Sequence, residues 1–184
     1  DTTYTYSNAI PFYNTIWDAS GDDTLDLSNF TKDLEVNLTD GDLSTLSFDV
    51  DDQRWANKQH GNLGIAFGCI IENAAGGAGN DSIIGNAADN NLRGNKGADS
   101  LNGGIGFDVL TGGLGQDTFQ IQPGNGNAVV MDFTDGEDKI LVTAPVAVTT
   151  RTIGNDTELL SGDDLMAIVL DSSGLLQQDG LTFF

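Results

Sequence analysis

Basic residues are scarce in this sequence. Lys and Arg together number 7 against 28 Asp and Glu, which gives the 184-residue chain a formal net charge of −21. A surface this acidic repels nucleic acid and anionic lipid, so neither is expected as a partner. Either the acids form a solvated or disordered surface, or bound cations match many of the carboxylates. Disorder throughout is disfavoured because 39% of the residues are hydrophobic and lie in strand-like runs.

Cysteine and histidine are limited to one residue each. A single cysteine, Cys69, forms no intrachain disulfide, which is typical of a reducing compartment but equally compatible with a secreted protein held together by metal. Cys69 lies in an apolar run and is interpreted as a buried small hydrophobe. The single histidine, His60, cannot supply the three protein ligands of a catalytic zinc, so no zinc is expected in this chain.

Long hydrophobic runs are also missing. No apolar stretch approaches the ~20 residues of a membrane span, so no span is expected. Residues 1–4 include no Met, no basic region and no apolar core, so they are not a signal peptide. A start without Met indicates a chain that is cut from something longer.

What the chain has is a nine-residue repeat. Five consecutive blocks read GGAGNDSII, GNAADNNLR, GNKGADSLN, GGIGFDVLT and GGLGQDTFQ. Position one is Gly76, Gly85, Gly94, Gly103 and Gly112; position six is Asp81, Asn90, Asp99, Asp108 and Asp117; position eight is Ile83, Leu92, Leu101, Leu110 and Phe119. The alternative, a flexible Gly/Asn linker, predicts no apolar residue at a fixed phase.

Each block predicts a tight turn followed by a short strand. Gly at position one, usually at position two, and at position four permits positive φ and lets carbonyl oxygens point inward. Position eight points into the protein, and stacked strands bury a continuous row of Ile, Leu and Phe. The turns present carbonyl oxygens and one carboxylate to a cavity, and Ca²⁺ prefers such hard oxygen ligands. Nonapeptides of this type are a known Ca²⁺-binding β-helix pattern.

Three further stretches accompany the repeats: TIWDASGDDTLDLSNF at 15–30, IENAAGGAGND at 71–81 and DFTDGEDKI at 132–140. The blocks resemble the RTX repeats of secreted bacterial proteins. Together with these stretches, they resemble the C-terminal domain of serralysin-type metalloproteases (peptidase M10) over roughly residues 1–142. The resemblance implies an all-β fold, in which a parallel β-roll is flanked by an N-terminal β region and a C-terminal antiparallel β cap. The expected parts are a lead-in at 1–14, an N-terminal β part at 15–75, the regular roll at 76–120 and the cap at 121–184.

In the resembling family, each coil holds two blocks, and Ca²⁺ sits between stacked turns of alternate blocks. Applied to this chain, the resemblance implies that the turns of Asp81, Asp99 and Asp117 stack on one edge of the roll. The other edge pairs Asn90 with Asp108. Several Ca²⁺ ions are therefore expected.

The resemblance also implies a set of metal-binding positions. Within the repeats they are Gly77, Gly79, Asp81, Asn86, Ala88, Asn90, Gly94, Gly97, Asp99, Gly103, Gly104, Gly106, Asp108, Gly112, Gly113, Gly115 and Asp117. Before the repeats, Asp18, Gly21 and Asp23 supply one part of a site, and Glu72 with the Ile70 carbonyl contributes to another. After the repeats, Asp138 matches a ligand position.

The chain departs from the family pattern at several positions. Asn90 replaces Asp, although an amide oxygen can still coordinate, and Ala88 replaces Gly. Asn95 and Lys96 stand where Gly and a small residue are common, and Lys96 brings a positive charge near a site. Ala128 falls where the family often has Asp, so the last site is expected to be weaker or absent.

The C-terminal part is expected to consist of antiparallel strands that cover the open end of the roll. These strands are expected at 129–133, 140–142, 146–153, 157–160 and 165–170. The last residues, 179–184, resemble an uncleaved export signal of type I secretion or form an ordinary last strand, and both interpretations stay open.

The serralysin motif H-E-x-x-H is missing, so this chain is not expected to be the protease itself. We expect a calcium-dependent folding, stabilisation and secretion module of a secreted, extracellular zinc metalloprotease. Its partners would be the N-terminal catalytic domain and the type I secretion apparatus, and the chain would be a monomer. The alternative is a stand-alone extracellular RTX binding or adhesion module. Trp55, in a polar loop expected at 49–62, would be its natural contact.

Overall fold

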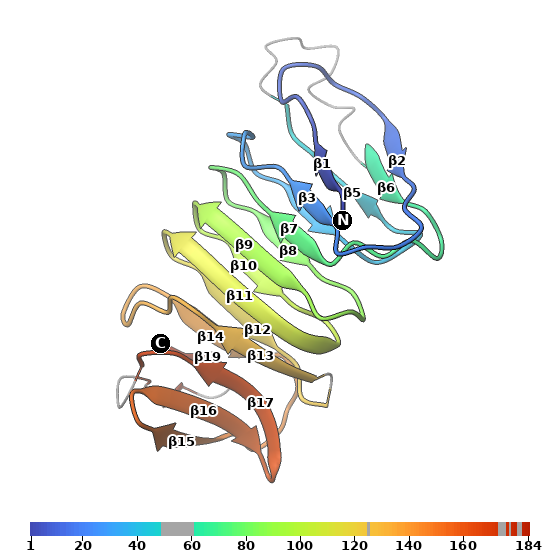
Figure 1. The fold of residues 1–184 in the computed structure, drawn as a ribbon. Coiled ribbons are helices and arrows are strands. Elements are labelled where there is room, and N and C mark those ends of the chain that lie inside the picture. Colours follow the sequence, from blue (N-terminus) through green and yellow to red (C-terminus); the bar gives the residue numbers. More distant parts are fainter. Residues whose placement is uncertain (49–60, 125, 173–175, 177, 180–181) are drawn as a thin grey trace.

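The computed structural model describes residues 1–48, 61–124, 126–172, 176, 178–179 and 182–184. Throughout these residues, every regular element is a β-strand, so the all-β prediction is confirmed (Figure 1). The same residues include no helix long and apolar enough to cross a membrane. Trp55, His60 and most of the loop expected at 49–62 lie outside the described residues.

The described strands form two large sheets and one small sheet. The first large sheet, in spatial order, is β1 (Thr3–Thr5), β3 (Thr24–Asp26), β7 (Asn73–Ala75), β9 (Asn91–Lys96), β11 (Gly106–Leu114), β13 (Gly126–Val130), β17 (Asp164–Val169), β16 (Asp156–Ser161) and β15 (Thr149–Ile153). The second is β18 (Gln178–Asp179), β19 (Thr182–Phe183), β14 (Lys139–Val142), β12 (Thr118–Ile121), β10 (Ser100–Asn102), β8 (Ser82–Ile84) and β4 (Glu35–Asn37). The small sheet is β2 (Asn14–Ile16), β6 (Leu63–Ile65) and β5 (Leu43–Ser44).

Consecutive strands from β7 to β14 alternate between the two large sheets. Neighbours within each sheet pair in parallel over this part of the chain. Equivalent residues of alternate blocks face each other, as Leu92 does with Leu110 and Leu101 with Phe119. One coil therefore spans two blocks, which is consistent with the predicted β-roll, and the coils stack along the molecule in Figure 1.

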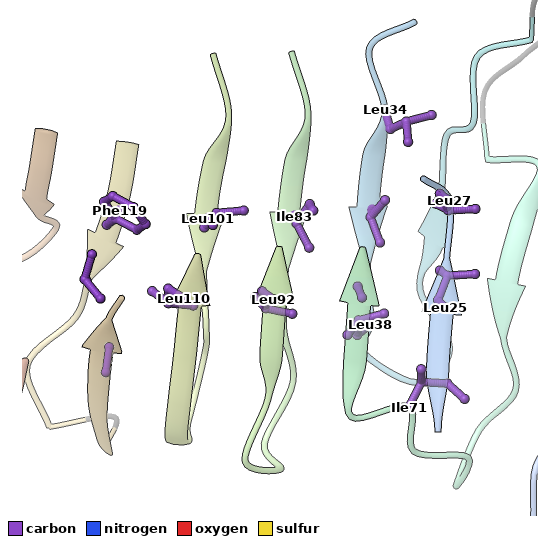
Figure 2. Packing of buried hydrophobic residues seen from close by; sticks show 14 of the residues in the cluster. Leu25, Leu27, Leu34, Leu38, Ile71, Ile83, Leu92, Leu101, Leu110 and Phe119 are labelled. Carbon is purple, nitrogen blue, oxygen red and sulfur yellow. The ribbon is translucent and has the colours of Figure 1, made fainter. Parts of the chain in front are cut away.

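The core lies between the two large sheets. Ile83, Leu92, Leu101, Leu110 and Phe119 are each 0% exposed, so the prediction that position eight points inward is confirmed. Figure 2 shows these side chains in successive strands of the two layers. Burying such a side chain contributes about 1.5–3 kcal/mol, so the regular row supplies much of the drive for stacking.

The parallel pairing of alternate strands extends further along the chain than expected. The strands expected at 129–133 and 140–142 were assigned to the antiparallel cap, and this assignment is wrong, because β13 pairs in parallel with β11 and β14 with β12. Val130 faces Leu110 and Ile140 faces Phe119, so both occupy the position-eight register after the glycine pattern has ended.

In the C-terminal part, antiparallel pairing begins only after β14. Strands β15, β16 and β17 form an antiparallel ribbon, and β19 pairs antiparallel with β14. β17 also joins the roll through a parallel pair with β13. Phe183 of β19 is buried in the core, and β19 lies between β14 and β18 in the second sheet.

Candidate metal sites

Four buried acids line up where strands of the second sheet begin. Asp81, Asp99, Asp117 and Asp138 directly precede β8, β10, β12 and β14, and they are 1–3% exposed. We call these four residues the acidic row. The structure brings together the three acids predicted for one edge and adds Asp138 as the fourth member, in register with Asp117.

Hydrogen bonds connect the acidic row from coil to coil. The Asp81 N–H donates to Asp99 Oδ1 at 2.7 Å, and the Asp99 N–H donates to Asp117 Oδ1 at 2.8 Å. The Asp117 N–H donates to Asp138 Oδ1 at 2.9 Å. The second oxygen of Asp81 accepts the Gly77 N–H of its own turn at 2.6 Å. Asp99 Oδ2, by contrast, is buried without a hydrogen-bond partner.

A second row lies on the opposite edge and is chemically mixed. It consists of Asp23, Glu72, Asn90 and Asp108, and we call it the mixed row. The first three directly precede β3, β7 and β9 of the first sheet, and Asp108 lies at the equivalent register within β11. The Asp23 N–H donates to Glu72 Oε2 at 2.8 Å, and the Asn90 N–H donates to Asp108 Oδ1 at 3.0 Å. Asp23 Oδ2 is buried without a partner. Ala128 pairs with Asp108, so this row ends without an acid.

The residues predicted before the repeats divide between two places. Glu72 and Gly21 lie against Asp23, since a Cβ built on Gly21 would stand 2.8 Å from Asp23 Oδ1. Asp18 Oδ2 instead accepts the Tyr4 hydroxyl at 2.5 Å, and this hydrogen bond raises the pKa of Tyr4 to about 12 and lowers that of Asp18. Ile70 has an exposed side chain.

The position-one glycines are required for space. A Cβ on Gly94 would lie 2.2 Å from Asp99 Oδ2 and 2.6 Å from the Gly112 carbonyl oxygen. A Cβ on Gly103 would lie 2.1 Å from Asp108 Oδ2. The expectation of positive φ at position one is wrong, because positive φ occurs only at positions two and four, and only in the last three of the five turns. The residues concerned are Asn95, Gly97, Gly104, Gly106, Gly113 and Gly115.

Two earlier glycines, Gly77 and Gly79, lie against a neighbouring turn. A Cβ on Gly77 would stand 2.3 Å from the Phe30 carbonyl oxygen, and one on Gly79 would stand 2.3 Å from the Lys32 carbonyl carbon. The segment around residues 30–33 therefore stacks on the first block as a preceding turn. Because Leu34 occupies the register of Asp81, that turn adds no acid to the acidic row.

Burial makes the four carboxyl groups of the acidic row, and that of Asp108 in the mixed row, difficult to ionise without a counter-charge. Burial raises the pKa of Asp99 to about 7 and those of Asp81 and Asp108 to about 6. It also raises the pKa values of Asp117 and Asp138. A bound cation offsets such a cost by favouring the charged form.

The donor set of the acidic row fits a hard cation. It offers carboxylate oxygens, one of which, on Asp99, has no hydrogen-bond partner. It also leaves a space at Gly94 that a Cβ would fill. No group of three or more His, Cys, Asp or Glu with the spacing of a metal site occurs among the described residues. Main-chain carbonyls must therefore supply part of any coordination shell, as they do in many Ca²⁺ sites.

Sequence reasoning missed several contacts in this region. Asp132 accepts the Gly112 N–H at 2.9 Å and the Gly113 N–H at 2.8 Å, and only its place in the DFTDGEDKI stretch marked it. No pattern in the sequence predicted the hydrogen bond between Tyr4 and Asp18. Asn95 Nδ2 donates to the Gly76 carbonyl at 2.7 Å.

Cys69 behaves as its apolar context predicted. It is a buried free cysteine whose burial raises the pKa of the thiol, and its Sγ accepts the Asp18 N–H at 3.2 Å. Cys69 therefore packs in the core and holds the backbone at Asp18 in place.

Known proteins similar to this chain are peptidases. Metallopeptidase AprA of Pseudomonas marginalis is 44% identical over 78 residues, which are 42% of this chain and 14% of that protein. Serralysin of Photorhabdus sp. (strain Az29) is 46% identical over 70 residues, which are 38% of this chain and 12% of the relative. Serralysin C of Dickeya chrysanthemi is 46% identical over 68 residues, which are 37% and 12% of the two chains.

These matches span a small part of each relative's length. A family model described as peptidase M10 serralysin C terminal, however, matches residues 2–159. This range includes the repeats, both rows of corner residues, β15 and the first part of β16. Because the match covers most of the chain, the protein belongs to the peptidase M10 serralysin C-terminal family.

Proposed function

We propose that this chain is a calcium-dependent folding, stabilisation and secretion module, the C-terminal domain of a secreted serralysin-like zinc metalloprotease. The acidic row carries the proposal, because four buried carboxylates stack at successive turns of one edge. The named relatives are metallopeptidases and serralysins, and the matches span only 12–14% of their lengths. Such a share is what a C-terminal part of a longer protease would give.

In this proposal, the acidic row and the carbonyls of its turns hold several Ca²⁺ ions. A bound Ca²⁺ supplies the positive charge that neutralises neighbouring carboxylates. The chain's own residues prepare the place: position-one glycines leave the space, and each Asp Oδ1 is oriented by an N–H from the adjacent coil. Binding that occurs only in the folded state adds directly to the free energy of folding.

The same coupling would serve export. Without Ca²⁺, facing carboxylates repel one another and the glycine-rich turns retain large conformational entropy, so the chain stays loose enough for type I secretion. Outside the cell, Ca²⁺ locks the turns, since extracellular modules bind it with Kd values of ~10⁻⁴–10⁻³ M. We place the mature domain outside the cell as a monomer, joined to an N-terminal catalytic domain that holds the zinc.

Circular dichroism of the chain in EGTA, and then in excess Ca²⁺, tests the folding part of this proposal. The β-signal should be lost in EGTA and return with Ca²⁺, while Mg²⁺ at the same concentration should not restore it. Unchanged β-content in EGTA would contradict the proposal. The protease part is tested separately, by translating the upstream coding sequence and searching it for H-E-x-x-H.

A stand-alone extracellular binding or adhesion module is the alternative. It is favoured by the exposed aromatic side chains of Trp17 and Phe67, which follow the paired strands β2 and β6. A glycan array probed in Ca²⁺ buffer distinguishes the two functions. Specific binding that is lost in the Trp17→Ala variant would support the alternative.

A further inference from the structure

The turn at residues 85–90, which we call the Asn90 corner, differs from the turns of the acidic row in the side chain that it presents at position six. Asn90 is 2% exposed, and its Oδ1 accepts the Asn86 N–H of its own turn at 2.8 Å. Asp81 does the same for Gly77 through Oδ2. The contact inside the turn is therefore preserved when an amide replaces the carboxylate.

Toward the adjacent coil, the chemistry of this side chain is reversed. Asn90 Nδ2 donates to the Glu72 carbonyl at 2.8 Å and to Asn86 Oδ1 at 3.1 Å. The corresponding atom of Asp99 is an oxygen, which accepts the Asp81 N–H. At the Asn90 corner, a donor thus occupies the place that an oxygen ligand has in the acidic row.

Asn86 adds a second amide to the same corner. Its Nδ2 donates to the Ile71 carbonyl at 2.8 Å and to the Leu38 carbonyl at 3.2 Å. Its Oδ1 accepts the Ala88 N–H at 2.9 Å. Both amide groups therefore have partners for oxygen and nitrogen alike, and they tie three segments of chain together.

This donor set does not fit a cation. Amide N–H groups cannot coordinate Ca²⁺, and here they point at the carbonyl oxygens of Ile71 and Glu72 that a cation would require. Asn95 also donates to one carbonyl near the acidic row, but the carboxylates of Asp81 and Asp99 both remain at that corner. At the Asn90 corner, the acid of the turn itself has been replaced, and only Asp108 of the next coil presents a carboxylate to Asn90.

We propose that the Asn86–Asn90 corner is a cation-free joint, closed by side-chain amides, and that Asn86, Ala88 and Asn90 bind no calcium ion. The inference rests on the proposed function only in assuming that other corners bind Ca²⁺. The joint holds its coil to Leu38 and Glu72 with no metal, whereas the acidic row needs Ca²⁺ to offset its charge.

Counting bound ions tests the joint. Equilibrium dialysis against saturating ⁴⁵Ca²⁺ gives the number of ions per chain for the wild type, Asn90→Ala, and the double variant Asn86→Gly/Asn90→Asp. Asn90→Ala should keep the wild-type number and melt at a lower temperature in Ca²⁺. The double variant, which removes both amides and restores an acid, should bind one additional ion. Ala87→Asp, an acid added at an exposed position of the same turn, is the matched control and should leave the number unchanged.

The outcomes separate this inference from the proposed function. Loss of one ion in Asn90→Ala would overturn the joint, and so would a folded double variant that binds no additional ion. A wild-type chain that binds no calcium would contradict the proposed function instead. The melting temperature would then decide the joint: it must fall in Asn90→Ala relative to Ala87→Asp, and equal melting temperatures would overturn it.

Discussion

The two rows of corner residues have similar backbones and different chemistry. The acidic row presents four carboxylates in register, and a chain of N–H donors orients them. The mixed row contains an amide at Asn90 and ends at Ala128 without an acid. Our two proposals together imply that one scaffold is closed by cations in one row and by amides in the other, because the residue at position six decides whether negative charge accumulates.

The largest effect is expected from Gly94→Ala. The added Cβ would overlap Asp99 Oδ2 and the Gly112 carbonyl, and the backbone of a stacked coil cannot withdraw. We expect a destabilisation of about 3 kcal/mol or more, at the upper end for overpacking, and a higher Ca²⁺ requirement for folding. Urea unfolding in Ca²⁺ measures both. Gly154→Ala is the control: with φ +65° and nothing within 4 Å of its Cβ, it should cost only ~1 kcal/mol.

Asp99→Asn should be the next largest change. It removes a charge from the middle of the acidic row and introduces a donor, as Asn90 does in the mixed row. The Ca²⁺ concentration at the folding midpoint should rise about tenfold or more, equivalent to ~1.4 kcal/mol. A calcium titration followed by circular dichroism measures this midpoint. Asp135→Asn, which removes the same charge from an exposed turn, should leave it unchanged, and equal shifts in both variants would refute the special role of the row.

Acidification should stabilise the calcium-free chain. The pKa of Asp99 is raised to about 7 and those of Asp81 and Asp108 to about 6, so the folded form binds protons that the unfolded form releases. Their contribution to stability is complete below the unfolded pKa near ~4 and is lost as pH rises through 6–7. In metal-free buffer, the β-signal should therefore increase between pH 8 and pH 5. Asp99→Asn should weaken this dependence, and a pH-independent signal would contradict the assignment.

The smallest effect is expected in the C-terminal ribbon. Arg151 donates to Glu158 across β15 and β16 on an exposed surface. Arg151→Ala should cost less than about 1 kcal/mol, because solvent screens exposed ion pairs. It should leave the calcium midpoint unchanged. A calcium-dependent change in this variant would show that the ribbon, too, responds to the metal.

The regular part of the fold follows closely from the residue pattern. A nine-residue period with an apolar position eight predicted the inward row from Ile83 to Phe119, and the structure confirms it. The strands near Val130 and Ile140 were misassigned, because the glycine signal of the turns disappears there while the register of the roll continues. A prediction based only on the glycines of the turns therefore ends the parallel coils too early, because the strands continue to stack without those glycines.

At the candidate metal sites, too, some features follow from residues within one block and others only from contacts between coils. The sequence alone determined which residues are turns, which side chains point inward and which acids recur at position six, because these depend on chain geometry within a single block. Only the tertiary structure decided that Gly94 must lack a Cβ, that Asp138 completes the acidic row and that the Asn90 amide donates to Glu72. The Gly112 carbonyl that faces Gly94, the Asp117 that faces Asp138 and the Glu72 that faces Asn90 are each 18 or more residues away, and they become neighbours only when the coils stack.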